Sequence, residues 1–394
     1  MSSNKNIPQL RFPGFTGKWE EKRMGDITDN VYQPQTISKE QFTNGGFPVY
    51  GANGVIGFFD KYNHETDQIL VTCRGASCGT INFSKGKCWI TGNAMVVNLD
   101  NVENQYNKHF IYYLLENSDL NSIITGSGQP QIVRGPLLNF SIYTPPTFSE
   151  QKKIALFLSE FDSLIAAQGE KVDALKEKKK GMMQQMFPQK GETTPRLRFP
   201  GFTGEWVEKK FKEITYPSGK KNRHNLPYER YSISNEVGFY PQSSQFEDGG
   251  GYLKNIDCRQ YIIVSPHSFA YNPARINVGS IGYQNLEKDV IVSSLYEVFQ
   301  TNELCDDLFL WQWFHSDIFH RMVIDVQEGG VRQYFFYEKL RECIIRLPLP
   351  AEQKKIAECL SAMDDMITSE SAKLDALKDH KKGLMQQLFP QPNK

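Results

Sequence analysis

Apolar residues recur every three or four positions along two stretches of the chain, 150–189 and 352–391. Polar side chains break the pattern at the same two steps in both stretches, at Gln168 and Lys179 in the first. An average spacing of about 3.5 residues is typical of the seam of a coiled coil. We therefore predict two long helices that pack on each other.

The two stretches are copies of one sequence. They align without a gap and share about 24 of roughly 40 positions, from EQKKIA at the start to FPQ at the end. Pro188 and Pro390 close the two copies, and a proline ends a helix because it has no amide hydrogen to donate. A repeat of this length indicates that the chain consists of two similar halves.

A second repeat, LRFPGFTG, begins at Leu10 and again at Leu197, and each copy is followed by a tryptophan. Its Pro-Gly pair and aromatic residues predict a fixed turn that seats the first strand of a globular part. Two like halves usually pack about an approximate two-fold axis, which would set the long helices antiparallel. The predicted divisions are a globular part at 1–148, a helix at 149–188, a second globular part at 189–350 and a second helix at 351–394.

The globular parts differ in sequence but share a rhythm of short apolar runs separated by turn residues, which is typical of strands. Strands are expected at 69–73, 79–83, 89–98, 228–233, 261–265, 269–272, 279–284 and 290–300, and short helices at 109–117 and 306–320. The predicted class is α+β, with a mixed sheet and short helices in each part. Beyond Ser127 the halves are aligned at the helix offset of 202, which pairs Gln131 with Gln333 and Leu138 with Leu340.

Charge and composition bear on which ligands the protein binds and in which compartment it lies. The formal net charge is +0 and the pI is near 7.0, which argues against indiscriminate polyanion binding but permits a locally basic groove. No apolar run approaches the roughly 18 residues of a membrane span, and the start of the chain lacks the apolar run of a secretory signal. We expect a cytoplasmic protein without membrane contact, whose 7 cysteines are free thiols.

Enzyme chemistry has one candidate, the segment Gly75–Gly79, which fits the G-x-S-x-G nucleophile elbow around Ser77. The elbow requires a helix after the serine, whereas TINF at 80–83 continues as a strand. No metal-binding pair of cysteines and no dinucleotide fingerprint is present. The sequence therefore offers no convincing catalytic constellation.

Polar side chains beside glycines and aromatic residues in the loops suit nucleic acid better. Arginine, asparagine and glutamine match base edges in the major groove, and lysine and arginine match phosphates. The candidate DNA-binding residues are Arg74, Ser77, Asn93, Ser127, Gln129, Gln131 and Arg134 in the first half, and Lys221, Arg223, Asn272, Arg275, Asn277, Arg332, Gln333 and Tyr334 in the second. For any one of them, an ordinary solvated loop side chain is the alternative.

The two EQKKIA helices, the repeated LRFPGFTG leader with its tryptophan, PVYGANGVIGFFDKY and WITGNAMVV together resemble the specificity subunits of type I restriction–modification systems. The resemblance implies two target-recognition domains, each reading one half of a split site in double-stranded DNA. It implies that the paired helices set the gap and dock two methyltransferase subunits, joined by two restriction–translocation subunits. S-adenosylmethionine, ATP and Mg would belong to those partners, leaving this subunit without cofactor or catalytic role.

Two other hypotheses remain open. The chain could be a non-catalytic scaffold whose globular parts bind proteins without any DNA sequence preference, or an enzyme that uses Ser77. A footprint without sequence preference would favour the scaffold, and full activity of a Ser77→Ala variant would exclude the enzyme.

Overall fold

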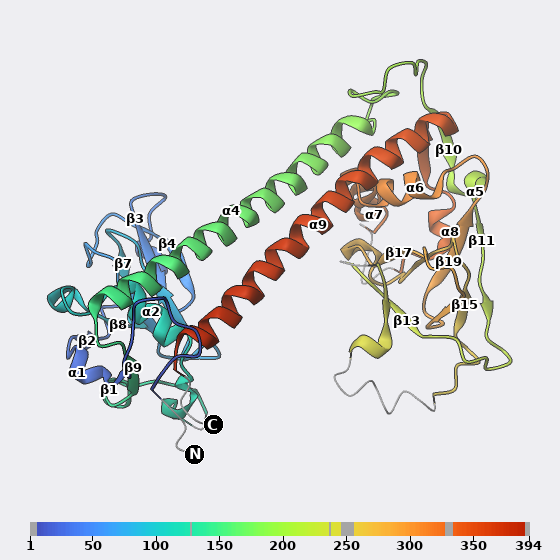
Figure 1. Ribbon diagram of the computed structural model, residues 1–394. Coiled ribbons are helices and arrows are strands. Elements are labelled where there is room, and N and C mark those ends of the chain that lie inside the picture. The colour runs from blue at the N-terminus through green and yellow to red at the C-terminus, as the bar shows by residue number, and fades with distance from the viewer. Residues whose placement is uncertain (1–5, 127, 236–237, 246–255, 328–333, 391–394) are drawn as a thin grey trace. The chain divides into compact units, whose positions relative to one another are not determined.

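The computed structural model of the chain describes residues 6–126, 128–235, 238–245, 256–327 and 334–390 (Figure 1). It divides into two compact units, unit 1 with Met1–Gly169 and Ala372–Lys394, and unit 2 with Glu170–Ser371. Each unit thus combines a globular part with the first portion of one long helix and the last portion of the other. We call the globular parts head 1 (residues 6–147) and head 2 (residues 187–349).

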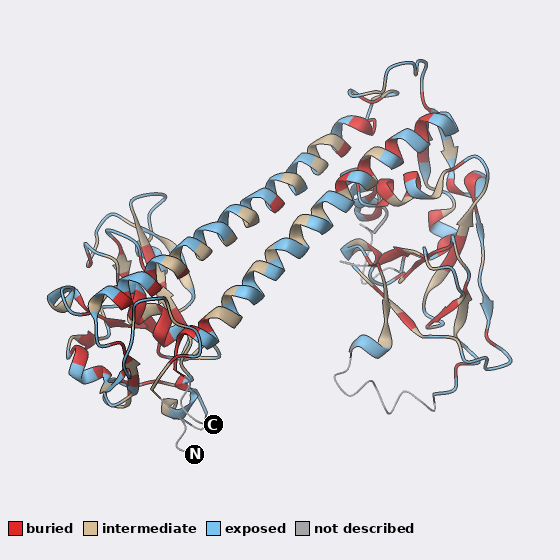
Figure 2. Ribbon diagram, viewed as in Figure 1, coloured by how far each residue is buried: buried red, intermediate tan, exposed pale blue. Residues whose placement is uncertain are grey.

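Both predicted long helices are present, as α4 (Phe148–Met186) and α9 (Pro350–Leu388). Each ends just before its proline, as predicted. Along both helices the apolar seam positions are buried or half-buried, and the outer faces are exposed (Figure 2). Near the helix ends Met183 and Met385 are buried, whereas the predicted seam residues Met182 and Leu384 are half-buried, so the 3.5-residue spacing identified the stripe but was one residue off there.

The helices pair in antiparallel fashion inside each unit. In unit 1, Leu158 near the start of α4 shares a core with Leu388 at the end of α9 (Figure 1). In unit 2, Met186 at the end of α4 shares a core with Leu360 near the start of α9. This arrangement confirms the predicted antiparallel pair.

The polar lysines of the seam have partners across it. In unit 1, Lys381 Nζ lies 2.7 Å from Asp162 Oδ1, and in unit 2, Lys179 Nζ lies 2.6 Å from Asp364 Oδ1. Each lysine side chain is only 12–14% exposed. Because polar groups inside a seam favour one register over others, these pairs help to specify how the helices align.

Head 1 contains a four-stranded sheet in the order β2-β8-β5-β6, a three-stranded sheet β4-β3-β7 and a two-stranded pair β1-β9. All pairings are antiparallel except β3 with β7. Its strands are β1 (Glu20–Arg23), β2 (Val31–Tyr32), β3 (Phe47–Gly51), β4 (Gly54–Phe59), β5 (Ile69–Thr72), β6 (Ile81–Phe83), β7 (Trp89–Ile90), β8 (Ala94–Val97) and β9 (Ser141–Thr144). Its helices are α1 (Met24–Ile27), α2 (Lys108–Glu116) and α3 (Arg134–Leu138), with 3-10 turns at Lys39–Gln41, Asp100–Val102 and Leu120–Ile123.

Head 2 repeats the four-stranded order as β11-β19-β16-β17 and the two-stranded pair as β10-β20, and adds β12-β15-β18 and β13-β14. Its strands are β10 (Val207–Lys210), β11 (Thr215–Pro217), β12 (Lys220–Lys221), β13 (Tyr231–Ser234), β14 (Gly238–Pro241), β15 (Ile262–Val264), β16 (Phe269–Tyr271), β17 (Ile281–Tyr283), β18 (Val290–Val292), β19 (Glu297–Thr301) and β20 (Ile344–Leu347). Its helices are α5 (Phe211–Ile214), α6 (Asp307–Phe314), α7 (Asp317–Gln327) and α8 (Tyr337–Leu340), with 3-10 turns at Gln242–Gln245 and Ile276–Val278. The α+β class is confirmed for both heads.

Three predicted elements are split in the structure. The expected strand at 89–98 is β7 and β8, and the expected strand at 290–300 is β18 and β19. Backbone hydrogen bonds close a turn in each gap, from Ala94 to Thr91 and from Tyr296 to Ser293. The expected helix at 306–320 is α6 followed by α7, because Ser316 stands between them and its hydroxyl accepts the amide of Phe319 at 3.4 Å.

The offset assumed for the second half of each head is wrong by one residue. Glu20 pairs with Thr144, and Val207, which matches Glu20 through the leader repeat, pairs with Leu347. Thr144 and Leu347 are thus equivalent and lie 203 positions apart. The linker before the second long helix is one residue shorter than that before the first, so Gln131 corresponds to Tyr334 and not to Gln333.

Each head rests on its helices through the same aromatic triangle. In unit 1 the ring centroids of Trp19, Phe110 and Phe389 lie 5.7, 6.2 and 5.7 Å apart. In unit 2 the corresponding rings, of Trp206, Phe309 and Phe187, lie 5.9, 6.4 and 5.5 Å apart. The tryptophan comes from the leader, one phenylalanine from a head helix and the other from the end of a long helix, which explains why the leader is repeated.

The leader also carries an arginine clasp in both units. Arg11 donates through Nε and Nη2 to both carboxylate oxygens of Glu150 at 2.8 Å, and Arg198 does the same to Glu352 at 2.7 and 2.8 Å. Both carboxylate side chains are 1% exposed. Each guanidinium also donates to two leader carbonyls, so it fastens the turn to the start of a long helix.

Candidate nucleic-acid interface

Three loops of head 1 meet at Cys73, where β5 ends. The Cys73 amide donates to the carbonyl of Asn93 at 3.2 Å, and its carbonyl accepts from Ile132 at 3.1 Å. Arg74 and Gln131 face each other across an antiparallel bridge. The fold therefore brings together Arg74, Asn93 and Gln131, three of the candidates that lie far apart in the sequence.

A cavity of about 340 Å³ opens beside this junction. Its walls are formed by Val31, Tyr32, Gln33, Arg74, Met95, Gln131, Ile132, Val133 and Arg134. The wall thus combines apolar surface with amide and guanidinium donors, a composition that suits the edge of a DNA base.

The polar side chains around the cavity divide into engaged and free groups. Arg134 Nε donates to the carbonyl of Val31 at 2.8 Å and Nη2 to that of Asp29 at 2.7 Å. Gln33 Nε2 likewise lies 2.9 Å from Cys73 Sγ. By contrast, the side chains of Arg74 and Gln131 form no hydrogen bond with any residue that the structure describes. Arg134 therefore holds β2 in place, and Arg74 and Gln131 are free to meet a ligand.

The other candidates of head 1 are placed differently. Gln129 and Asn93 are exposed beside the junction. Ser77 is half-buried in the turn after Arg74, its carbonyl accepts from Thr80 at 3.1 Å, and β6 follows it instead of a helix. Ser127 lies outside the described residues.

Head 2 has an equivalent junction with different side chains. The amide of Phe335 donates to the carbonyl of Pro273 at 2.9 Å, as the amide of Ile132 does to Cys73 in head 1. Arg275 is exposed at the start of the neighbouring 3-10 turn. Tyr334 is 54% exposed and stacks on Phe336 with the centroids 5.4 Å apart. Head 2 therefore has an arginine one position beyond the equivalent of Arg74 and an exposed aromatic pair at the place of Gln131.

The remaining candidates of head 2 are less concentrated. Asn272 accepts the amide of Ala274 at 3.0 Å and shapes the turn that leads to Arg275, and Asn277 is half-buried within the 3-10 turn. Lys221 and the exposed Arg223 belong to β12 and the turn after it, and Lys221 Nζ donates to Gln260 at 2.9 Å. Arg332 and Gln333 lie outside the described residues.

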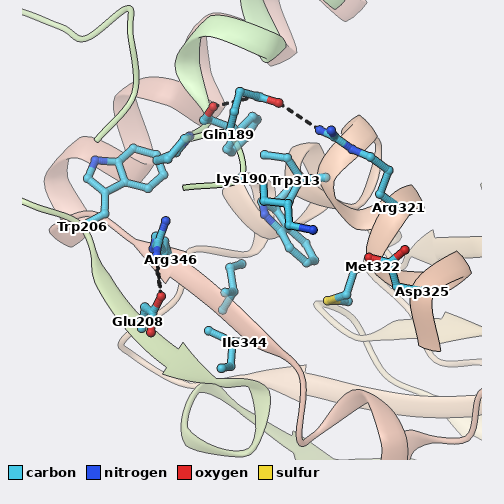
Figure 3. Close-up of a pocket in the computed structure, with 14 residues that line it drawn as sticks. Gln189, Lys190, Trp206, Glu208, Trp313, Arg321, Met322, Asp325, Ile344 and Arg346 are labelled. Atoms are coloured by element: carbon cyan, nitrogen blue, oxygen red, sulfur yellow. Dashed lines mark hydrogen bonds and ion pairs between the residues drawn. The ribbon is translucent and has the colours of Figure 1, made fainter. Parts of the chain in front are cut away.

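A larger cavity of about 530 Å³ in unit 2 contains none of the candidates (Figure 3). Trp206, Trp313, Met322 and Ile344 line it together with charged residues. Arg346 Nη2 lies 2.6 Å from Glu208 Oε1, so those charges neutralise each other. Lys190, Arg321 and Asp325 add further charged side chains to the lining. The apolar walls match a protein side chain better than a phosphate, and the lining residues had no motif by which the sequence could reveal them.

Burial sets the protonation state of three cysteine thiols. Burial raises the pKa of the thiols of Cys78 and Cys88, and that of Cys343 to about 11, so these thiols stay protonated at neutral pH. Among the residues that the structure describes, there is no group of three or more histidine, cysteine or acidic side chains that could hold a metal ion. No helix in the described part of the chain is long and apolar enough to cross a membrane.

Comparison with known proteins gives a consistent result. The model of the type I restriction modification DNA specificity domain matches residues 16–177 and again residues 204–379. The MjaVIII specificity subunit of a type I restriction enzyme from Methanocaldococcus jannaschii is 25% identical over 416 residues, covering 98% of this chain and 94% of that protein. The EcoprrI specificity subunit from Escherichia coli is 30% identical over 118 residues, 30% of this chain and 28% of that protein.

A solved structure matches the fold along nearly the whole chain. The crystal structure of a type I restriction–modification S subunit from M. genitalium covers 98% of this chain and 100% of its own, with a TM-score of 0.66 and 16% identity. At that identity the likeness concerns the fold alone.

Proposed function

This chain belongs to the family of type I restriction modification DNA specificity domains, and we propose that it selects the DNA sequence on which a type I restriction–modification complex acts. Each head reads one half of a bipartite site. The observation that supports this proposal best is the pair of equivalent junctions, at Cys73 and at Pro273, which share a backbone contact but present different free side chains. Two copies of one frame with different surfaces suit a reader of two different half-sites.

In head 1 the readers are Arg74 and Gln131, with Asn93 and Gln129 beside them. Arginine can bind guanine and glutamine can bind adenine through two hydrogen bonds each, because their paired groups match the major-groove edges of those bases. In head 2 the readers are Arg275 and Tyr334. Exposed cations such as Arg223 suit phosphate contacts, which position the protein without adding sequence information.

The long helices set the number of unread base pairs between the half-sites. Each contains 39 residues. At about 1.5 Å per residue such a helix is roughly 58 Å long, the length of about 17 base pairs of DNA. The heads occupy part of that length, so a gap of about one turn of DNA or less is expected.

The partners follow from the family. Two methyltransferase subunits bind this chain along its helices, and two restriction–translocation subunits complete the nuclease. S-adenosylmethionine, ATP and Mg are bound by those partners, and this subunit takes no catalytic step itself. Its own contribution is to choose the DNA.

A domain exchange tests the proposal. Residues 30–148 are replaced by the equivalent segment of another family member, and the methylated motif is read by sequencing the DNA of cells that also carry the methyltransferase partner. One half of the motif should change, whereas the other half and the gap should stay the same because head 2 and the helices are untouched. A change in both halves would contradict the assignment of one head to one half.

The alternative is a scaffold that assembles proteins without reading DNA. The cavity of Figure 3 favours it locally, because its apolar walls suit a protein partner. The two functions are separated by footprinting the full complex. Protection that is independent of sequence would support the scaffold and remove the proposed reader.

A further inference from the structure

We infer that the tip of the β3–β4 hairpin of head 1, called the ribbon below and part of the sheet β4-β3-β7, faces the major groove of the first half-site, where Val55 and Ile56 contact the methyl groups of thymines. The inference rests on the proposed function and deepens it, since none of the ribbon residues was among the candidates. It makes the ribbon a second reading element beside Arg74 and Gln131. Three features of the ribbon support it.

The first feature is a β-bulge at the tip. Val49 pairs with Gly57 and Tyr50 with Val55, so Ile56 is an extra residue without an opposite partner. Neighbouring residues of a regular strand point to opposite faces, and a bulge changes the direction of their side chains. As a result Val55 is 52% exposed and Ile56 is 47% exposed, side by side at the end of the ribbon. The bulge therefore presents two apolar side chains to solvent together.

The second feature is that the tip is held in place. The carbonyl of Ala52, in the turn of the ribbon, accepts hydrogen bonds from the hydroxyl of Thr72 and from Nδ2 of Asn82, the latter at 2.9 Å. The amide of Thr91 also donates to the carbonyl of Tyr50 at 3.0 Å. Two exposed apolar side chains on an anchored turn are ready to bind a ligand without loss of backbone entropy.

The third feature is the position of the anchor. Thr72 ends β5, and Arg74 follows two residues later, at the junction with Gln131. Residues two apart in an extended chain lie on one face, so the strand that holds the ribbon tip also carries the free arginine. The ribbon and the Arg74–Gln131 pair thus belong to one reading edge.

Chemistry and charge favour DNA over a protein partner for this ribbon. A thymine methyl group is the main apolar feature of the major groove, and exposed aliphatic side chains can contact it there. The exposed lysines 85 and 87 flank the ribbon, and the amide of Lys85 donates to the hydroxyl of Tyr50 at 3.3 Å. The nearby carboxylate of Asp67 is engaged by the amide of Gly86 at 2.7 Å. The lysines are therefore placed to meet phosphates beside the groove.

Replacing thymine by uracil removes only the methyl group and so tests the contact directly. Duplexes that contain the methylated motif, with each thymine of the first half-site replaced in turn, are bound to the complex of the full chain with its methyltransferase partner. One replacement should weaken binding by about fourfold, the change expected for one buried methyl group. The complex with Val55→Ala or Ile56→Ala should no longer distinguish uracil from thymine there.

Controls separate a lost contact from a damaged fold. Val207→Ala changes a valine of β10 that is 58% exposed in head 2, and it should leave the uracil effect intact. Val55→Thr keeps the shape of the side chain but replaces a methyl by a hydroxyl, so it should lose the uracil effect without a change in melting temperature.

The remaining outcomes overturn the inference in distinguishable ways. If the variants keep the uracil effect, or if the wild-type complex shows none or its first half-site has no A·T pair, the ribbon is not a thymine reader, although the proposed function stands. Loss of the methyltransferase partner with an unchanged motif would make the ribbon a protein-docking element. A wild-type complex without any sequence preference would remove the proposed function itself.

Discussion

Heads 1 and 2 are alike where they meet the long helices and different where they face a ligand. A buried glutamine supports each head in the same way: Gln151 accepts the amide of Asn107 at 3.0 Å, and Gln353 accepts that of Asp306 at 2.8 Å. The aromatic triangle and the arginine clasp are also shared. In contrast, the hairpins in this part of the two heads differ, because β4 of head 1 carries a bulge with exposed Val55 and Ile56, whereas β13 and β14 of head 2 pair in unbroken register. A duplicated fold can therefore change what it binds without changing how it is held.

The largest effect is expected from removing the arginine clasp, which both heads share. Arg11→Ala leaves the carboxylate of Glu150, which is 1% exposed, without its cation, and removal of one partner of a buried ion pair costs about 3–5 kcal/mol. Arg198→Ala should have the same effect on unit 2, because its contacts are the same. Native-state hydrogen exchange of the full chain measures the opening free energy of each unit separately.

A matched control uses another leader-region arginine. Arg196 pairs with Glu192 on the surface, where its side chain is 67% exposed, so Arg196→Ala should change stability by no more than about 0.5 kcal/mol. Unequal losses for Arg11→Ala and Arg198→Ala would show that the two heads are not held with equal strength, despite the same geometry.

The next effect sharpens the difference between the reading surfaces. Arg74→Ala should reduce discrimination at one position of the first half-site by about 1–3 kcal/mol and leave the second half-site unchanged, because a free arginine at the junction can bind a base. Arg275→Ala should do the reverse. Binding of the full complex to duplexes with single base changes measures both.

Arg134→Ala provides the comparison within head 1. Its guanidinium is bound to the carbonyls of Val31 and Asp29, so its loss should lower the stability of head 1 and weaken binding to all sequences alike. If Arg74→Ala gives that uniform pattern instead, with a salt dependence reduced by about one charge, Arg74 contacts a phosphate and not a base.

The sequence sufficed for the frame because the frame is periodic and repeated. The spacing of apolar residues located the buried faces of α4 and α9, and the prolines located their ends. The sequence did not reveal how the residues of head 1 align with those of head 2. The repeat EQKKIA matches without a gap, but one residue is missing just before it in the second half, and only the pairing of β9 and β20 reveals that loss. Gln131 was matched with Gln333 for this reason.

The site was harder to predict than the fold because it depends on contacts between distant segments. Arg74 and Arg134 look alike in the sequence, and only the carbonyls about a hundred residues away decide that Arg134 is engaged. The exposure of Val55 and Ile56 depends on a bulge, and a bulge cannot be predicted from the alternation of apolar and polar residues. Side-chain type indicated the chemistry, but tertiary contacts determine which of these residues are available to a ligand.

The smallest effect is a difference between the two heads in how their stability depends on pH. Burial lowers the pKa of His64 in head 1 below its usual 6.5, although the charge of Asp100 acts the other way. The ring is 7% exposed, its Nε2 lies 2.7 Å from the hydroxyl of Tyr32, and its Nδ1 lies 2.6 Å from Oδ1 of Asn63. That oxygen accepts the amide of Ile90, so Nδ1 of His64 is the donor in the pair with Asn63. The lowered pKa keeps the ring neutral at neutral pH, and Nε2 then accepts from the hydroxyl of Tyr32.

A lowered pKa makes head 1 sensitive to acid. Below pH 6.5 the unfolded chain gains a proton at His64 that the folded chain does not, so stability should fall as the pH drops toward the lowered pKa. The histidines in the described part of unit 2 are all exposed, so their protonation differs less between the folded and unfolded chain. Hydrogen exchange between pH 7.5 and 5.5 should therefore show a larger loss of protection in unit 1. His64→Gln should remove the excess, since a glutamine cannot be protonated, and an excess that persists in this variant would assign the acid sensitivity to another group.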